Sequence, residues 1–136
     1  MLFSKPVSDI VQFEFNYTYG NYSGAFVEYI LLKGDNEYGV SLKMRGGDEH
    51  NRNEFAVDGD TVKKLEEILN RYNVSRWDNF SRSNKHVLDG NSFSFSLKTG
   101  SGDSISAHGY MSYPRHYAEV RKELDEFFGN LCRGLG

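Results

Sequence analysis

The sequence is poor in cysteine and proline, with one cysteine and two prolines among 136 residues. A single thiol, Cys132, cannot form a disulfide within the chain, so the disulfide-rich secreted class is excluded and a reducing compartment, the cytoplasm, is predicted. No run of about 18 apolar residues is present, and we therefore expect no membrane insertion. The opening residues lack the basic stretch and long apolar run of a secretory signal, so we expect no leader there.

The chain also lacks a surplus of positive charge, since 16 basic residues face 19 acidic ones for a net charge of −3. This balance argues against nucleic acid as a partner. Hydrophobic residues make up only 38% of the chain, but ten Phe, nine Tyr and one Trp compensate because each buries a large area. We therefore expect a single folded domain over residues 1–136, with a core rich in aromatic rings.

The first half of the chain shows the period-two alternation of half-buried strands. Residues 11–19 read VQFEFNYTY, in which aromatic side chains alternate with polar ones. Residues 25–32 and 38–45 are predicted to be the second and third strands, because glycine and asparagine between them favour turns. The polar stretch 46–53 is expected to be a solvated loop, followed by a short strand over 54–57.

A helix is predicted after this strand, with Asp60 as its N-cap and Asn73 as its left-handed end. Trp77 is expected to seal the helix against the sheet. Residues 93–97 and 105–109 then alternate as two strands around a Gly- and Ser-rich hairpin loop. Pro114 suits the first position of a second helix, whose apolar stripe runs to the end of the chain.

These elements predict an α+β domain with about six strands, in the order β-β-β-β-α-β-β-α, and a mostly antiparallel sheet. Each helix has one apolar stripe, so we expect both helices on one face and the other face open to solvent. Phe26, Ile30 and Leu32 also point to that open face and suggest cover by a loop, a partner or a second subunit. Its polar residues are predicted to be Glu14, Asn16, Thr18, Glu28, Lys43, Arg45, Ser94, Ser96, Lys98, Ser106 and His108.

Three segments in the second half carry a resemblance. Residues 72–80 lead from a helix into Trp-x-x-Phe, residues 87–95 contain Leu-Asp-Gly-Asn-Ser-Phe, and residues 109–117 contain a Tyr-Pro helix start. In these motifs the chain resembles a family of uncharacterised bacterial proteins. The resemblance covers about the last half of the chain and implies the fold outline without an activity. Some members are envelope-associated, which implies an envelope location if the chain is part of a longer protein.

The common catalytic and cofactor motifs are missing. The histidines at 50, 86, 108 and 116 lack the spacing of metal ligands, and no segment has the acidic pattern of a calcium loop. The Gly-rich stretch 100–104 precedes a strand, whereas a phosphate loop precedes a helix. No serine sits in a nucleophile elbow, and Cys132 lies near a helix C-terminus, where the dipole disfavours a thiolate. We therefore predict no catalytic residue, no metal and no cofactor.

Two groups of residues remain as candidate ligand-binding sites. Arg115 and His116 fall in the first turn of the last helix, and His108 comes one strand earlier. Lys43, Arg45, Lys98 and His108 alternate outward on the open face. Each group also has an ordinary explanation, as a surface helix end or as charges that keep an open sheet from aggregating. Tyr22, Tyr110 and Tyr113 are loop tyrosines that can stack on a sugar or a peptide.

The pattern as a whole favours a non-enzymatic binding domain that uses the open face or an edge strand, with a second copy or another protein as partner. The alternative is a small enzyme or an anion-binding protein with a site around His108, Arg115 and His116. Missing motifs are weak grounds against an enzyme, because catalytic groups are recognised by geometry and not by order along the chain.

Overall fold

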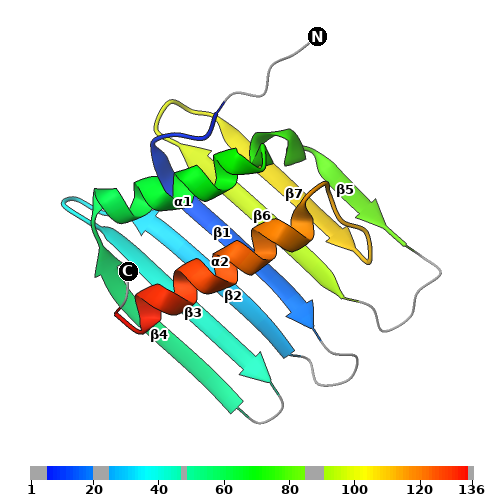
Figure 1. Ribbon diagram of the computed structural model, residues 1–136, viewed down its shortest axis with the longest axis horizontal. Coiled ribbons are helices and arrows are strands. Elements are labelled where there is room, and N and C mark those ends of the chain that lie inside the picture. The colour runs from blue at the N-terminus through cyan, green and yellow to red at the C-terminus, as the bar shows by residue number, and fades with distance from the viewer. Residues whose placement is uncertain (1–5, 20–24, 47–48, 85–90, 135–136) are drawn as a thin grey trace.

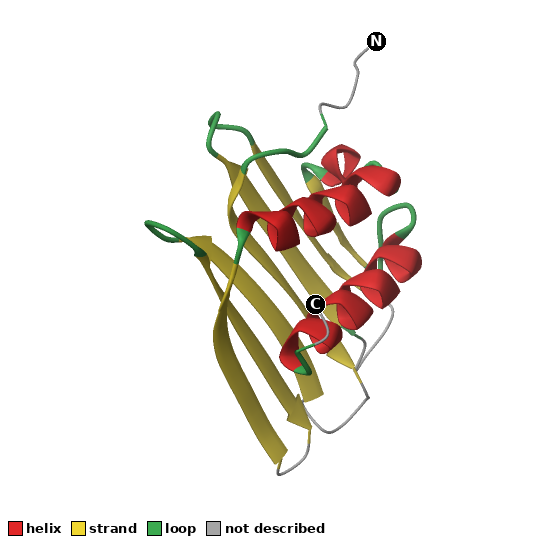
Figure 2. Cartoon of the chain, turned by 60° about the vertical axis from the view of Figure 1, so that its left-hand side comes forward, coloured by secondary structure: helices red, strands yellow, loops and turns green. Residues whose placement is uncertain are grey.

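The computed structural model describes residues 6–19, 25–46, 49–84 and 91–134, which form one seven-stranded sheet and two α-helices. Figures 1 and 2 show both helices on the same face of the curved sheet, as the sequence predicts. The elements in chain order are β1 (Ile10–Tyr19), β2 (Ala25–Lys33), β3 (Tyr38–Gly46), β4 (Glu49–Val57), α1 (Gly59–Arg71), the 3-10 helix η1 (Val74–Trp77), β5 (Phe80–Ser83), β6 (Ser92–Thr99), β7 (Ser104–Tyr110) and α2 (Tyr117–Cys132).

The strands follow the order β4-β3-β2-β1-β6-β7-β5 across the sheet. All neighbouring strands are antiparallel except β5, which pairs with β7 in parallel. The predicted α+β class is confirmed, but the expected count of about six strands was too low. The missing strand is β5, whose four residues include one partly buried apolar side chain, Phe80, and are too few to show an alternation.

The fourth strand is longer than predicted. Residues 49–53, which were expected to be a loop, continue β4 and pair with β3 from Gly46↔Glu49 to Leu42↔Asn53. Residues 51–54 of this edge strand are all exposed, so this part of β4 has no apolar side, unlike Phe55 and Val57 farther along it. Sequence alternation therefore could not identify this part of β4.

The core lies between the sheet and the two helices. Phe13, Phe15 and Phe95 on β1 and β6 are almost completely buried, and Phe128 of α2 stacks at 5.8 Å from Phe13. Trp77 closes one end of this core, 5.3 Å from the ring of Phe95, which confirms its predicted sealing role. Large aromatic rings thus supply the buried apolar area of the core, although hydrophobic residues make up a small share of the chain.

The helix ends differ in detail from the prediction. Asp58 is the N-cap of α1, since its Oδ1 accepts a hydrogen bond of 3.0 Å from the Thr61 backbone N–H, and this bond lowers the pKa of Asp58. Asp60 lies in the first turn instead. Pro114 lies two residues before the N-cap of α2, so α2 begins at Tyr117. Asn73 has the left-handed conformation that was predicted, with φ of 53°.

The opposite face of the sheet carries the predicted polar residues in rows that cross the strands. One row runs through Lys43, Glu28, Asn16, Ser94 and His108, each opposite the next in the strand register. The three predicted apolar residues also point to this face: Phe26 and Ile30 are half-buried and Leu32 is 50% exposed. No described helix covers this side.

Candidate functional site

A hollow of about 470 Å³ lies beside the start of α2. Its cationic lining residues are Arg76, Arg82, Arg115 and His116, and none of the residues that line it is acidic. We call this hollow the arginine pocket. Small-molecule sites typically occupy about 300–1,000 Å³, so the pocket is large enough for an organic ligand.

Three separate elements bring these cations together. Arg76 belongs to η1, and Arg115 and His116 form the turn before α2. Arg82 belongs to β5, where its register partner on β7 is the buried Gly109, so it lies on the helix-covered side. The parallel pairing of β5 therefore carries Arg82 to the same rim as the helix start.

The floor of the arginine pocket is aromatic and well anchored. The Trp77 indole N–H donates a hydrogen bond of 3.0 Å to the Arg115 carbonyl, which holds the turn before α2. The guanidinium of Arg82 lies 5.4 Å from the centre of the Phe80 ring. Tyr113 stacks on Tyr117 at 4.6 Å and keeps 39% of its surface exposed. The lining of the arginine pocket thus combines cationic side chains with aromatic rings that pack on one another.

The acidic groups around the pocket have other partners. His116 Nδ1 lies 3.0 Å from Glu119, and this hydrogen bond lowers the pKa of Glu119. Glu123 accepts hydrogen bonds from Tyr72 and Arg71, which lower the pKa of Glu123. In the described part of the chain, no carboxylate forms an ion pair with Arg82 or Arg115.

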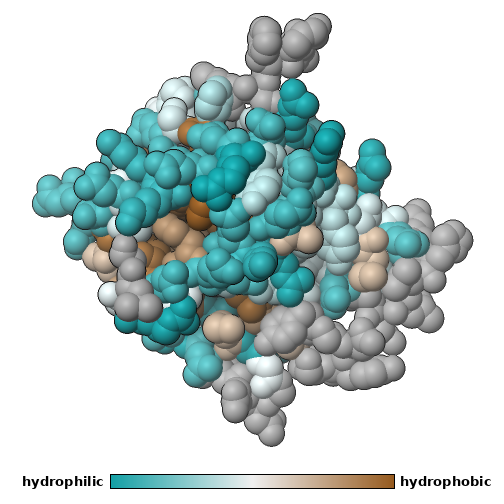
Figure 3. Space-filling view, viewed as in Figure 1, coloured by the Kyte–Doolittle hydropathy of each residue, from teal (hydrophilic) through white to brown (hydrophobic). Residues whose placement is uncertain are grey.

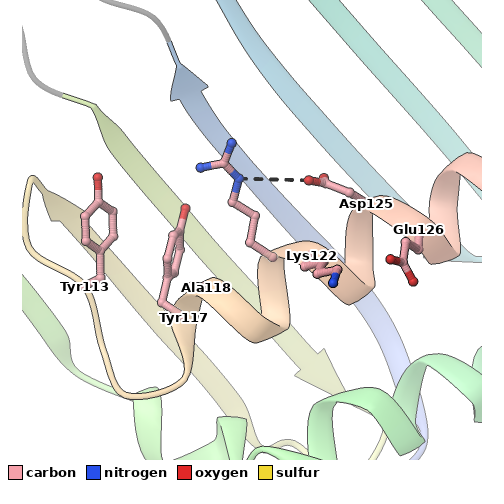
Figure 4. Close-up of a pocket in the computed structure, with 7 residues that line it drawn as sticks. Tyr113, Tyr117, Ala118, Lys122, Asp125 and Glu126 are labelled. Carbon is pink, nitrogen blue, oxygen red and sulfur yellow. Dashed lines mark ion pairs between the residues drawn. The ribbon is translucent and has the colours of Figure 1, made fainter.

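A second hollow, of about 560 Å³, lies on the other side of Tyr113 along α2. Figure 4 shows Tyr113 and Tyr117 side by side at one end of it, with Lys122, Asp125 and Glu126 farther along the helix. Its charges are mixed, because Arg121 and Lys122 accompany the two carboxylates. This hollow is therefore less selective for an ion of one sign than the arginine pocket.

Asp125 is the centre of a polar network beneath this second hollow. The Tyr17 hydroxyl donates to Asp125 at 2.9 Å and the Tyr29 hydroxyl at 2.6 Å. The Arg121 guanidinium lies 3.9 Å above the Tyr17 ring and 3.9 Å from Asp125, the ion pair drawn as a dashed line in Figure 4. The network ties α2 to β1 and β2.

The same network keeps both tyrosines protonated. Burial, reinforced by the Asp125 carboxylate, raises the pKa of Tyr17 to about 12 and raises the pKa of Tyr29 further. A phenol with such a pKa holds its proton at neutral pH and acts as a hydrogen-bond donor. The arrangement therefore suits cross-linking of the fold better than proton transfer.

The structure separates the three residues of the predicted helix-start site. Arg115 and His116 share the arginine pocket, but His108 lies on the opposite face of the sheet, where its Nε2 is 2.8 Å from the Ser81 hydroxyl. The reason is the alternation along β7, since His108 stands between the buried residues Ala107 and Gly109. A pocket containing all three side chains does not form.

The basic residues predicted on the open face lie there, and two of them, Lys43 and Arg45, line one hollow of about 270 Å³ together with Arg52. Lys43 is paired in register with Glu28, and the Arg45 guanidinium lies 5.5 Å from the Phe26 ring. Lys98 is on β6, two strands away from β2, and faces Gln12. Lys43 and Arg45 thus share a hollow and each has an acidic or aromatic neighbour, whereas Lys98 lies apart from them on β6.

Sequence reasoning missed Arg76 and Arg82 in the arginine pocket. No sequence signal pointed to Arg82, because β5 was not recognised as a strand. Tyr113 was noted only as a loop tyrosine. The Asp125 network was also missed, since its residues lie 96 and 108 positions apart in the chain.

Among the described residues, no three histidine, cysteine, aspartate or glutamate side chains gather as metal ligands. None of the helices in the described part of the chain is long and apolar enough to cross a membrane.

Comparison with protein-family models found no match, and a search of curated proteins found none either. The resemblance to an uncharacterised bacterial family therefore stays a prediction.

Proposed function

We propose that this chain is a non-enzymatic interaction domain that pairs with a second copy of itself through the edge strand β4. The sheet ends at β4, which has β3 as its hydrogen-bonded neighbour on one side. Figure 1 shows β4 along the outer margin of the sheet. Its nine residues offer a longer edge than the four residues of β5 at the other end. An extended free edge is a template for another strand.

The charges of β4 are self-complementary in one antiparallel register. Arg52 and Glu54 lie on the same face, with 2.9 Å between Arg52 Nε and Glu54 Oε1. A two-fold axis through Asn53 places each Arg52 opposite Glu54 of the second copy. A shift by two residues in either direction sets Arg52 against Arg52 or Glu54 against Glu54. The charges therefore select the register centred on Asn53, and this observation carries the proposal.

The helix-side face of β4 supports the same arrangement. Asn53 meets its own counterpart at the two-fold axis, where two side-chain amides can donate to and accept from each other. Phe55 is half-buried and lies opposite Asn51 of the second copy in this register. Figure 3 shows hydrophobic surface between the two helices on the β4 side of the molecule. A neighbouring chain would reduce the exposure of Phe55 and of Met44, which is 45% exposed.

The same charges have a competing role, because charged side chains on an edge strand discourage association. Within one chain, Arg52 and Glu54 are 61% and 62% exposed, so their ion pair contributes little stability. A purely protective edge and a dimer edge therefore differ in oligomeric state and not in fold. Charge reversal distinguishes the two.

Sedimentation velocity over a wide concentration range tests the proposal. We expect a concentration-dependent dimer for the natural sequence. Arg52→Glu places two glutamates opposite each other at both ends of the pairing and should weaken the dimer at least tenfold. The double variant R52E/E54R restores opposite charges and should recover it. Lys98→Glu, an equal charge reversal on β6, is the control and should leave the dimer intact.

A natural sequence that stays monomeric at the highest concentration would exclude the dimer. A dimer that persists in Arg52→Glu would exclude the β4 register. Circular dichroism of each variant checks that the fold is retained, since exposed edge residues change stability by only about 0.5 kcal/mol.

A further inference from the structure

We infer that the arginine pocket binds the phosphate group of a small phosphate monoester whose planar organic part lies against Tyr113. This site is on the helix-covered side next to β5, at the other end of the sheet from β4. It is independent of the proposed dimer and can be tested in a monomeric variant.

The first argument is convergence of charge in a concave site. Arg76, Arg82 and Arg115 come from η1, β5 and the turn before α2, so the fold brings together three guanidinium groups that are separate in sequence. Like charges gathered in one hollow repel one another unless an anion joins them. Glu119 and Glu123 are engaged by His116, Tyr72 and Arg71, and the ion pairs of the described residues leave Arg82 and Arg115 without a carboxylate.

The second argument concerns which anion fits best. A guanidinium is a planar fork that forms two parallel hydrogen bonds to one oxyanion. A phosphate monoester presents three charged oxygens and nearly two negative charges at neutral pH, enough to engage more than one arginine. A carboxylate has two oxygens and one charge. A pocket rimmed by Arg76, Arg82, Arg115 and His116 therefore matches a phosphate better than a carboxylate.

The third argument concerns the part of the ligand beyond the phosphate. Tyr113 lines both hollows, is 39% exposed, and is held flat by stacking on Tyr117 at 4.6 Å. Phe80 and Pro114 add apolar surface to the arginine pocket. A planar group attached to the phosphate can therefore stack on an ordered ring without leaving the pocket. An aromatic phosphate monoester combines both features.

Calorimetric titration with phenyl phosphate, inorganic phosphate and benzoate tests the inference. Phenyl phosphate should bind most tightly and benzoate most weakly. Arg82→Gln and Arg115→Gln should each raise the Kd for phenyl phosphate about tenfold, because each removes charge-assisted hydrogen bonds. Tyr113→Ala should bring phenyl phosphate to the level of inorganic phosphate and leave the latter unchanged.

Arg45→Gln is the matched control, since it removes the same charge from the opposite face of the sheet. Equal weakening by Arg45→Gln and Arg82→Gln would reduce the effect to overall charge and overturn the inference. Absence of saturable binding, or benzoate binding as tightly as phenyl phosphate, would overturn it as well. Arg82 and Arg115 are exposed, so loss of fold in both variants is not expected, and circular dichroism verifies this.

The titrations should be repeated in Arg52→Glu. If phosphate binding persists there, the pocket works in the monomer, and failure of the dimer proposal leaves the phosphate site standing. If the natural sequence dimerises but binds no phosphate, the phosphate inference fails alone.

Discussion

The two faces of the sheet are made by the same strands and differ completely in what they contact. On β6, Phe93 and Phe95 are 3% and 1% exposed under the helices, whereas Ser94 and Ser96 point to the open side. Adjacent residues of a strand point to opposite faces, so a change of one position exchanges an aromatic core for a hydroxyl surface. The comparison shows that the helix-covered face forms the hydrophobic core, whereas the side chains of the open face are not part of that core.

The faces also differ in shape. The open face consists of rows of side chains that cross the strands in register, such as Glu28 beside Lys43. The helix-covered face is uneven, because the start of α2 and the turn of η1 rise above the sheet and leave hollows around Tyr113. The helix side thus has hollows of about 560 and 470 Å³, and a smaller one of about 270 Å³ involves Lys43 and Arg45 of the open face beside β4.

The largest expected effect on stability comes from a substitution in the core under the helices. Phe95→Ala removes a ring that contacts Phe13, Phe15 and Trp77, and should lower the free energy of unfolding by about 3–5 kcal/mol. Ser94→Ala, one residue away on the open side, should change it by less than about 0.5 kcal/mol. Guanidinium denaturation measures both. A large loss for Ser94→Ala would mean that the open face is covered in solution.

A second substitution sharpens the role of the polar network under α2. Asp125→Ala removes the carboxylate that accepts from the Tyr17 and Tyr29 hydroxyls and should lower the free energy of unfolding by about 2–4 kcal/mol, because two buried donors lose this charged acceptor. Glu126→Ala, the exposed neighbour lining the same hollow, is the control. Asp125→Asn keeps one acceptor oxygen and should recover part of the loss. Equal stability of the Asp125→Ala and Glu126→Ala variants would contradict the structural role.

A third prediction concerns alkaline pH. Burial raises the pKa of Tyr17 from 10.0 to about 12, so this tyrosine stabilises the folded state below pH 10. Between pH 10 and about 12 the unfolded chain loses the proton first, and the free energy of unfolding falls with rising pH. Tyr17 alone should account for up to about 3 kcal/mol of the free energy of unfolding. Denaturation curves of the natural sequence and Tyr17→Phe across this window measure the difference, and identical pH profiles would argue against the shift.

The two faces themselves were predictable from the sequence. Alternation placed Phe13 and Phe15 inward and Glu14 outward, and the single apolar stripe of each helix predicted that both would cover one side. Trp77 and Asn73 were also recognised in their roles. The edges were less predictable. Most of β4 lacks an apolar side, and β5 is too short to alternate, so the local pattern carries little information about either strand.

The residues of the candidate sites were predicted only in part, because some of them lie on the edge strands of the sheet. Arg115 and His116 share a pocket as the helix start suggested, but His108 is on the other face because β7 alternates there. Arg82 joins them only because β5 pairs in parallel with β7. The open-face residues Lys43, Arg45 and Lys98 were placed correctly, yet their spacing across the sheet depends on strand order.

By itself, the sequence determined the local elements and the side of each element that avoids water, because burial of apolar area acts on neighbouring residues with a fixed period. The tertiary structure alone decided the strand order, the edge position of β4, and the meeting of Arg76, Arg82 and Arg115. These depend on contacts between residues distant in the chain. Such contacts arise from the packing of all elements together, and no local pattern encodes them.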